Sequence, residues 1–241
     1  PNWNAVDIFL AKLGTMELDT LRARQDEEHE FAKRRAKMDQ SREAPIPQLP
    51  IANMAEYKER FYTSKHGFEG WQPRGAELSG LKQHYVEGLM WVMEYYYQGP
   101  PSWKWFYPHH YAPMASDLVN LTTHATNVKF DRGTTAFLPH QQLLAVLPPM
   151  SYRSMPKAYW ALLRSANSPL LKYFPKHLEI DREGARAPWE GTVLIPFIDE
   201  KILLAAFESV QGQLTDIDRK RNSQGPAIIF EYNEEIEPYS F

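Results

Sequence analysis

The fold of this chain is decided by residues 84–113, which read HYVEGLMWVMEYYYQGPPSWKWFYPHHYAP. This stretch holds ten of the 32 aromatic residues and three of the eight histidines. Its first half is apolar nearly all round, which predicts a helix that is buried on every side. The Gly-Pro-Pro sequence at 99–101 ends that helix, because proline lacks an amide donor and clashes with the preceding turn. We interpret the stiff aromatic loop that follows, residues 102–113, as a functional site.

Length and composition are those of a globular protein with one large domain or two small ones. The chain has 241 residues, of which 43% are hydrophobic and 24% are charged, and this is enough to build a substantial core. The net charge of −3 counts against binding of nucleic acid by overall charge alone, but it does not exclude a local groove that binds nucleic acid. The absence of cysteine excludes disulfides and thiolate metal sites.

Targeting signals are not evident in this sequence. No apolar run approaches the ~18 residues of a membrane span, and no secretory or transit signal stands at the start. The first residue is Pro1 rather than methionine. We therefore expect a piece of a longer chain, or a chain processed from one, without a membrane partner.

Apolar spacing predicts a mainly α protein, an irregular helical domain with long loops and a small β-hairpin. We expect N-terminal helices over residues 1–40, broken at Gly14, restarted at a Thr15 cap and partly projecting into solvent. A proline-rich linker over 41–50 precedes a helical core over 51–241.

Within the core, the helix that enters the aromatic loop is expected to start near Leu81. Its Gly88 costs about 1 kcal/mol relative to alanine, which predicts a close approach of another backbone. The other expected elements are helices over 54–65, 140–147, 154–163 (capped by Ser154), 200–210 (capped by Asp199) and from 215 (a Thr215/Asp218 capping box), a hairpin of 178–180 with 191–194, and a strand over 227–232.

No pattern of acidic residues indicates a hydrolytic metal centre, which needs several converging carboxylates. Helix capping accounts for Asp199, Asp216 and Asp218. No P-loop, GxGxxG, GxSxG or HExxH motif occurs. The sequence therefore predicts no catalytic residue and no metal ligand in this chain.

The histidines of the decisive stretch leave one alternative open. A metal enzyme using His84, His109 and His110 is conceivable, but adjacent side chains cannot easily share an ion without a special turn. Packing or hydrogen bonding is the simpler role for these rings.

The aromatic loop itself carries the functional interpretation. Trp103, Trp105, Phe106 and Tyr107 can stack on nucleobases, with Lys104 near a phosphate. Each stacked base typically contributes about 1–3 kcal/mol without sequence preference. The alternative is that these rings fill a core. We expect at least one of them to lie exposed in a cleft.

Several long blocks of the chain follow a familiar order. They are VDIFLAKLGTMELDTLRARQDEE (6–28), YVEGLMWVMEYYYQGPPSWKWFYPHHYAPMASDL (85–118), QQLLAVLPP (141–149), SPLLKYFP (168–175), LEIDREGARAPWEGTVLIPFIDEKILLAA (178–206) and LTDIDRKRNS (214–223). Together they resemble the XRN family of 5′→3′ exoribonucleases, in its second conserved, helical region. The stretch 102–117 is somewhat closer to the nuclear branch. Residues 66–80 match no block of that family. The segment between Asn120 and Thr134 is shorter than the corresponding segment of the family.

The resemblance implies a division of labour. It implies that this region packs against an α/β nuclease domain, absent from these 241 residues, which binds two Mg²⁺ or Mn²⁺ ions and the 5′ monophosphate of RNA. It also implies that one tryptophan stacks on the 5′-terminal bases, which we place at Trp103 or Trp105. The matching motif then puts Lys104, Tyr107, His109 and His110 along the RNA channel.

The leading hypothesis is therefore the helical, substrate-channel portion of an exoribonuclease that degrades 5′-monophosphorylated single-stranded RNA. Such a chain is inactive alone and works inside the cell, and the resemblance favours the nucleus over the cytoplasm. The rival hypothesis, from another class, is a non-catalytic scaffold or interaction protein built on a relic of this fold. The two differ in whether an indole of the loop faces a cleft.

Overall fold

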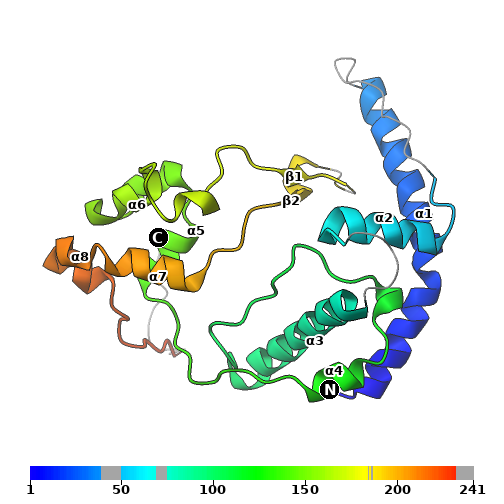
Figure 1. Ribbon diagram of the computed structural model, residues 1–241, viewed down its shortest axis with the longest axis horizontal. Helices are drawn as coiled ribbons and strands as arrows, with labels where there is room; N and C mark the ends of the chain where they lie inside the picture. Colours follow the sequence, from blue (N-terminus) through cyan, green and yellow to red (C-terminus); the bar gives the residue numbers. More distant parts are fainter. Residues whose placement is uncertain (39–49, 69–74, 184, 186, 232–241) are drawn as a thin grey trace. The chain divides into compact units, whose positions relative to one another are not determined.

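The computed structural model describes residues 1–38, 50–68, 75–183, 185 and 187–231. It confirms the predicted fold class, because it is mainly helical with one small antiparallel hairpin (Figure 1). The elements are α1 (Trp3–Met38), α2 (Met54–His66), α3 (Gly75–Gln98), α4 (Leu121–Thr126), α5 (Pro139–Val146), α6 (Trp160–Arg164), β1 (Ile180–Asp181), β2 (Thr192–Val193), α7 (Glu200–Glu208) and α8 (Asp216–Arg221), with 3-10 turns between them.

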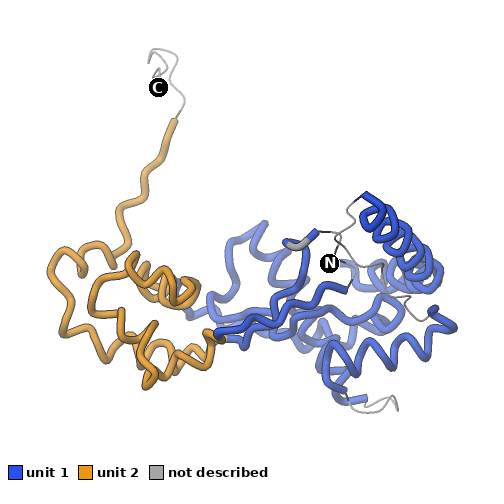
Figure 2. Tube along the Cα trace, turned by 90° about the horizontal axis from the view of Figure 1, so that it is seen from above, with its two compact units in different colours: residues 1–136, 176–197 blue, residues 137–175, 198–241 orange. Residues whose placement is uncertain are grey.

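The described chain forms two compact units (Figure 2). Among the described residues, unit 2 has one buried hydrophobic cluster and unit 1 has two. Unit 1 contains residues 1–136 and 176–197, and unit 2 contains residues 137–175 and those from 198 onward. The boundaries that the sequence predicts, 1–40, 41–50 and 51–241, stay a prediction. Residues 41–49 of the predicted linker lie outside the described residues.

The N-terminal region is one unbroken helix, so the predicted break at Gly14 and restart at Thr15 are wrong (Figure 1). A Cβ at Gly14 would lie 2.8 Å from the Cα of Ser116, so this glycine serves a close approach between two backbones. The carboxylate of Glu17, one turn further along, accepts from the backbone amides of Ala115 (2.8 Å) and Ser116 (3.0 Å). The helix continues because tertiary contacts at Gly14 outweigh its weak helix propensity.

Acidic side chains of α1 thus start two short helices of unit 1. Glu17 caps the 3-10 turn Ala115–Asp117, and Asp7 accepts from the amide of Leu121, the first residue of α4, at 3.0 Å. These bonds satisfy backbone donors that a helix start leaves unpaired. Beyond Leu21 no described side chain of α1 is buried.

The helix α3 differs most from expectation, because only Leu81 and Val86 of its residues are buried. The prediction of burial on every side is wrong, and so is the start near Leu81, since α3 begins at Gly75. Tyr96 and Tyr97 are 76% and 80% exposed. Apolar composition does not guarantee burial, and an exposed apolar flank of this kind is typical of an interaction surface.

Local capping signals are confirmed in unit 2 and at the hairpin. Asp199 accepts from the amides of Lys201 and Ile202, and Thr215 with Asp218 forms the predicted capping box. The strands β1 and β2 pair Ile180 with Val193. The predicted helices over 54–65, 140–147, 200–210 and from 215 are all present within a few residues.

Two local predictions are wrong. Ser154 caps no helix: Met155, which precedes a proline, takes an extended conformation (φ −101°, ψ 152°), and α6 begins only at Trp160. The terminal strand is absent over 227–231, where no described strand lies beside the chain to pair with it.

None of the helices in the described part of the chain combines the length and the hydropathy of a membrane span.

Replacement of Gly14 by alanine tests the packing of α1. We expect Gly14→Ala to lower the free energy of unfolding by about 1–3 kcal/mol, because the new methyl group overlaps the Ser116 backbone. The matched control is Gly80→Ala in α3, where nothing lies within 4 Å of the new Cβ, and it should raise stability by about 0.5–1 kcal/mol. Urea unfolding followed by circular dichroism measures both. Equal effects of the two substitutions would contradict the contact.

Candidate nucleic-acid interface

The aromatic loop leaves α3 through a glycine in a left-handed conformation. Gly99 has φ +90°, which residues with a side chain rarely adopt, and its amide donates to the carbonyl of Tyr95. Pro100 and Pro101 follow, so the helix ends where the sequence predicts. The loop therefore begins at a defined point with a defined direction.

Trp105 is anchored against α3. Its Nε1 donates to Oε2 of Glu87 at 3.0 Å. Its ring lies near-parallel to Trp91 (centroids 6.1 Å apart, 24°) and edge-on to Phe130 (6.1 Å, 82°). A Cβ at Gly88 would lie 3.1 Å from this indole. The close approach predicted at Gly88 thus occurs, but the neighbour is an indole and not a backbone.

Trp103, two residues earlier, has an outward side chain on a fixed backbone. Its indole is 54% exposed and makes no ring contact with another described residue. Its amide donates to Oγ1 of Thr134 at 2.8 Å, while Nε1 of Trp91 donates to the carbonyl of the buried Ser102 at 2.9 Å. The backbone on both sides of this position is therefore held, and the ring remains accessible.

Tyr107 and His109 turn inward and are half-buried. The hydroxyl of Tyr107 donates to the carbonyl of Tyr111 at 2.9 Å, and burial raises the pKa of this phenol. His109 Nε2 shares a hydrogen bond with His84 Nδ1 at 2.9 Å. This confirms hydrogen bonding as a role for two of the histidines.

His110 points elsewhere than its neighbour. Its ring donates to the carbonyl of Ile195 at 3.0 Å and stacks on Phe197 (4.7 Å, 28°), against which the half-exposed Phe106 also packs (5.5 Å). The structure therefore separates His110 from His84 and His109. Among the described residues, no group of three or more His, Cys, Asp or Glu side chains is arranged to hold a metal ion.

A third imidazole, which sequence reasoning missed, completes the histidine cluster. His66, at the end of α2, lies with its ring centroid 6.0 Å from that of His109, and its buried Nε2 has no hydrogen-bond partner. Burial, together with the charge of His109, lowers the pKa of His66 to about 4. No local sequence signal connects a residue at position 66 with the loop.

The far end of the loop is held by an ionic network. Lys65 pairs with Asp181 and, at 2.6 Å, with Glu183, and the hydroxyl of Tyr111 donates to Asp181. Burial raises the pKa of Asp181, but the hydrogen bonds from Lys65 and Tyr111 outweigh it and leave that pKa below its usual value. These groups border a mixed polar pocket of about 250 Å³, which also touches α1 through Arg24.

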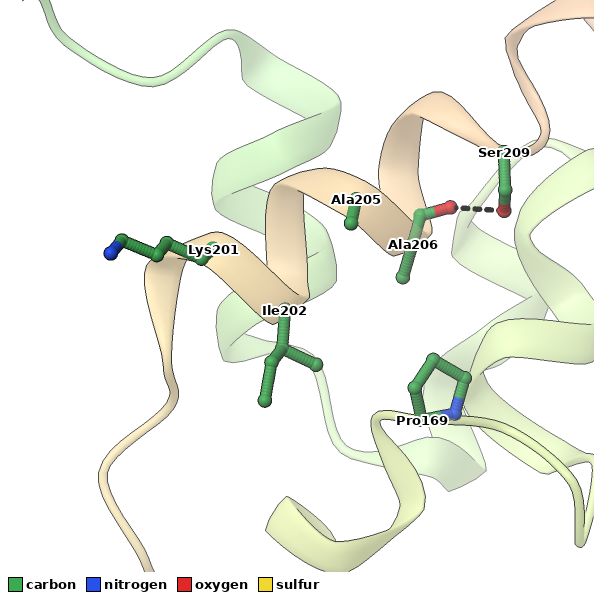
Figure 3. A pocket seen from close by; sticks show the side chains of 6 residues that line it. All are labelled: Pro169, Lys201, Ile202, Ala205, Ala206 and Ser209. Carbon is green, nitrogen blue, oxygen red and sulfur yellow. Dashed lines mark hydrogen bonds between the residues drawn. The ribbon is translucent and has the colours of Figure 1, made fainter.

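Unit 2 contains a second pocket, of about 390 Å³, between α7 and Pro169 (Figure 3). Its described lining is mainly apolar, with Lys201 as the single charged residue, and Ser209 donates to the carbonyl of Ala206 at 2.6 Å. None of those six lining residues has a carboxylate or an imidazole.

The sequence-predicted site residues therefore divide into three sets. Trp103 and Lys104 are exposed; Trp105, Tyr107 and His109 are partly buried and anchor the loop; His110 is exposed and packs on the segment after β2. Their roles toward RNA stay predictions.

Acid should destabilise the fold through His66. The unfolded chain protonates this ring below pH about 6.5, whereas the folded chain does so only near pH 4. Between these values the unfolded state binds more protons, so the free energy of unfolding should fall as the pH falls. His66→Gln should flatten this dependence in urea titrations at pH 4.5–7, and His177→Gln, at an exposed position, should not. Identical slopes for both variants would contradict the assignment.

Comparison with known proteins supplies the context of this site. The family model described as "Xrn1 helical domain" matches residues 11–239. The protein named 5'-3' exoribonuclease 2 of Schizosaccharomyces pombe is 40% identical over 174 residues, which are 72% of this chain and 17% of that protein. Its namesakes in Aspergillus fumigatus (40% over 174 residues, 72% and 16%) and Saccharomyces cerevisiae (38% over 175 residues, 72% and 17%) are similar to the same extent. The chain thus spans less than a fifth of the length of these relatives.

Proposed function

This chain belongs to the family of the Xrn1 helical domain, and from that membership we propose that it forms the substrate-channel portion of a 5′→3′ exoribonuclease. The substrate in this proposal is single-stranded RNA with a 5′ monophosphate, and the place of action is the nucleus. The relatives named as 5'-3' exoribonucleases support the reaction class. The ordered blocks at 85–118 and 178–206 support the position within such an enzyme.

Cleavage, in this proposal, takes place on a separate nuclease region. The described residues contain no cluster of His, Cys, Asp or Glu side chains suited to Mg²⁺ or Mn²⁺, and this supports placing the metal ions on another region. Carboxylates of an α/β nuclease region would hold the ions and bind the 5′ phosphate. The present chain would position the RNA.

The single observation that carries the proposal is the difference between the two tryptophans of the loop. Trp103 is 54% exposed on a backbone held by Thr134, whereas Trp105 is bonded to Glu87 and stacked on Trp91. A flat ring on a fixed backbone stacks any base and loses little entropy on binding. We therefore assign base stacking to Trp103 and support of the loop to Trp105.

The exposed flank of α3 suits the contact with the nuclease region. Val92, Met93 and Tyr95 are each about half exposed, and Tyr96 and Tyr97 more so. Tyrosine and methionine are enriched in the centres of protein interfaces. In this arrangement the indole of Trp103 would face the metal site of the nuclease region. The channel between the two regions would admit a single strand of RNA but not a duplex.

A scaffold built on the same fold is the second candidate, and the same α3 flank favours it. The two candidates differ in the role of the loop, because a scaffold does not need the exposed indole of Trp103 to stack on RNA.

Activity of the purified chain separates cleavage from positioning. With Mg²⁺ or Mn²⁺ and a 5′-phosphorylated RNA, the isolated chain should release no nucleotides, because it lacks a set of metal ligands among its described residues. Addition of a nuclease region of the family should restore stepwise decay. Metal-dependent decay by the chain alone would contradict the proposal.

Substitution of the exposed indole tests base stacking. Trp103→Ala should weaken binding of single-stranded RNA by about 5- to 150-fold, the equivalent of one stacked base, and should reduce processivity in the reconstituted enzyme. Trp103→Phe should recover most of this loss. The matched control is Trp189→Ala, which removes an indole that is 84% exposed in the hairpin turn. Full affinity and processivity of Trp103→Ala would remove the stacking role and favour a scaffold.

A further inference from the structure

One part of unit 2 carries cations without any acidic residue. Between Gly133 and Leu178 the sequence has no Asp or Glu, although the whole chain has 30 acidic and 27 basic residues. Within unit 2 the cations of this stretch are Arg153, Lys157, Arg164 and Lys172. A local positive field therefore exists on a chain whose net charge is negative.

The structure gathers two of these cations on one aromatic ring. The guanidinium carbon of Arg164 lies 4.4 Å from the ring centroid of Tyr152, and that of Arg153 lies 5.7 Å from it. Nε of Arg153 also donates to the Tyr152 hydroxyl at 3.2 Å. Residues eleven positions apart in sequence thus hold two positive charges at one tyrosine.

The ring that holds them is itself firmly placed. Tyr152 packs edge-on against Trp160 (5.1 Å, 88°), and Nε1 of Trp160 donates to the carbonyl of Met155 at 2.8 Å. Tyr159 and Leu163, on the same short helical segment, are completely buried in the core of unit 2. The two arginines therefore stand on a rigid support rather than on a mobile loop.

No carboxylate of the described residues neutralises either guanidinium. Both arginines are exposed, and neither takes part in an ion pair with a described acidic residue. The hydrogen bond from Arg153 and the two positive charges lower the pKa of the Tyr152 phenol, which reports the same positive field. Met150, two residues before the ring, is 91% exposed.

We propose that Tyr152, Arg153 and Arg164 form a second contact for single-stranded RNA, on unit 2, in addition to the stacking position at Trp103. A guanidinium that lies over an aromatic ring can still donate from its two terminal nitrogens, which the Nε hydrogen bond of Arg153 leaves available, and this planar fork matches two phosphate oxygens. The exposed Met150 and the flat guanidinium faces provide apolar and stacking area for a base. This inference rests on the proposed function for the identity of the polyanion.

RNA suits this surface better than an acidic peptide. Arginine clusters also recognise acidic peptide motifs, so charge alone does not decide between the two polyanions. The described surface at Tyr152 adds flat guanidinium groups on one ring, on which a base can stack, and phosphates spaced along a strand can meet these charges without sequence preference.

Salt-dependent RNA binding tests the contact. The affinity of the intact chain for a single-stranded RNA should fall with rising salt, with a slope of log K against log [salt] of about −0.7 for each phosphate held. The double variant Arg153→Gln/Arg164→Gln should make this slope shallower by about 1.4 and weaken binding at low salt. The matched control, Arg34→Gln/Lys37→Gln on the exposed end of α1, removes the same charge and should leave the slope unchanged. Circular dichroism verifies that both variants fold.

The outcomes separate this inference from the stacking proposal. Trp103→Ala should lower the affinity without changing the slope, because stacking releases no counterions. A shallower slope in the arginine variant together with an inert Trp103→Ala would retain the second contact and remove the stacking role. A slope equal to that of the α1 control would overturn the second contact. It would also be overturned if the wild-type chain bound no RNA at low salt, or bound polyglutamate more tightly than RNA.

Discussion

The indole of Trp105 lies closely over Gly88 of α3, where an added Cβ would stand 3.1 Å from the ring, and the position of the aromatic loop depends on this fit. The carboxylate of Glu87 receives its N–H, and Trp91 lies beneath its face. Trp91 in turn holds the carbonyl of Ser102. This one packing arrangement on α3 thus determines where the loop runs and which of its rings is left outside.

The two tryptophans illustrate how identical residues acquire different roles from backbone geometry. In an extended loop, side chains two positions apart point the same way, but the held backbone at Ser102 and Trp103 turns this chain between them. Trp105 consequently packs inward against α3, and Trp103 is left to solvent. An arrangement with one anchoring ring and one presenting ring costs less conformational entropy on binding than two free rings would.

Sequence reasoning succeeded where the signal is local. The Asp199 cap, the Thr215 capping box and the glycine stop of α3 each depend on a few neighbouring residues, and each is present. It failed at Gly14, where a distant backbone at Ser116 decides the helix.

The candidate site shows the same limit. Composition located the aromatic loop, but it could not tell Trp103 from Trp105. The difference arises because Glu87 accepts from the indole of Trp105 and Thr134 accepts from the amide of Trp103, and both contacts form only in the folded chain. It also missed His66, which reaches His109 only in the folded chain. Burial of α3 was overestimated because an exposed apolar flank has the same composition as a buried one.

The hairpin segment 176–197 belongs to unit 1 but follows 39 residues of unit 2 along the chain. A ribosome makes the aromatic loop long before it makes Asp181, which Tyr111 reaches across 70 positions of sequence. The Tyr111 end of the loop therefore has no anchor in the nascent chain until Asp181 has been translated. Unit 1 can be completed only after most of unit 2 has been made, so the two units do not fold strictly in the order of the sequence.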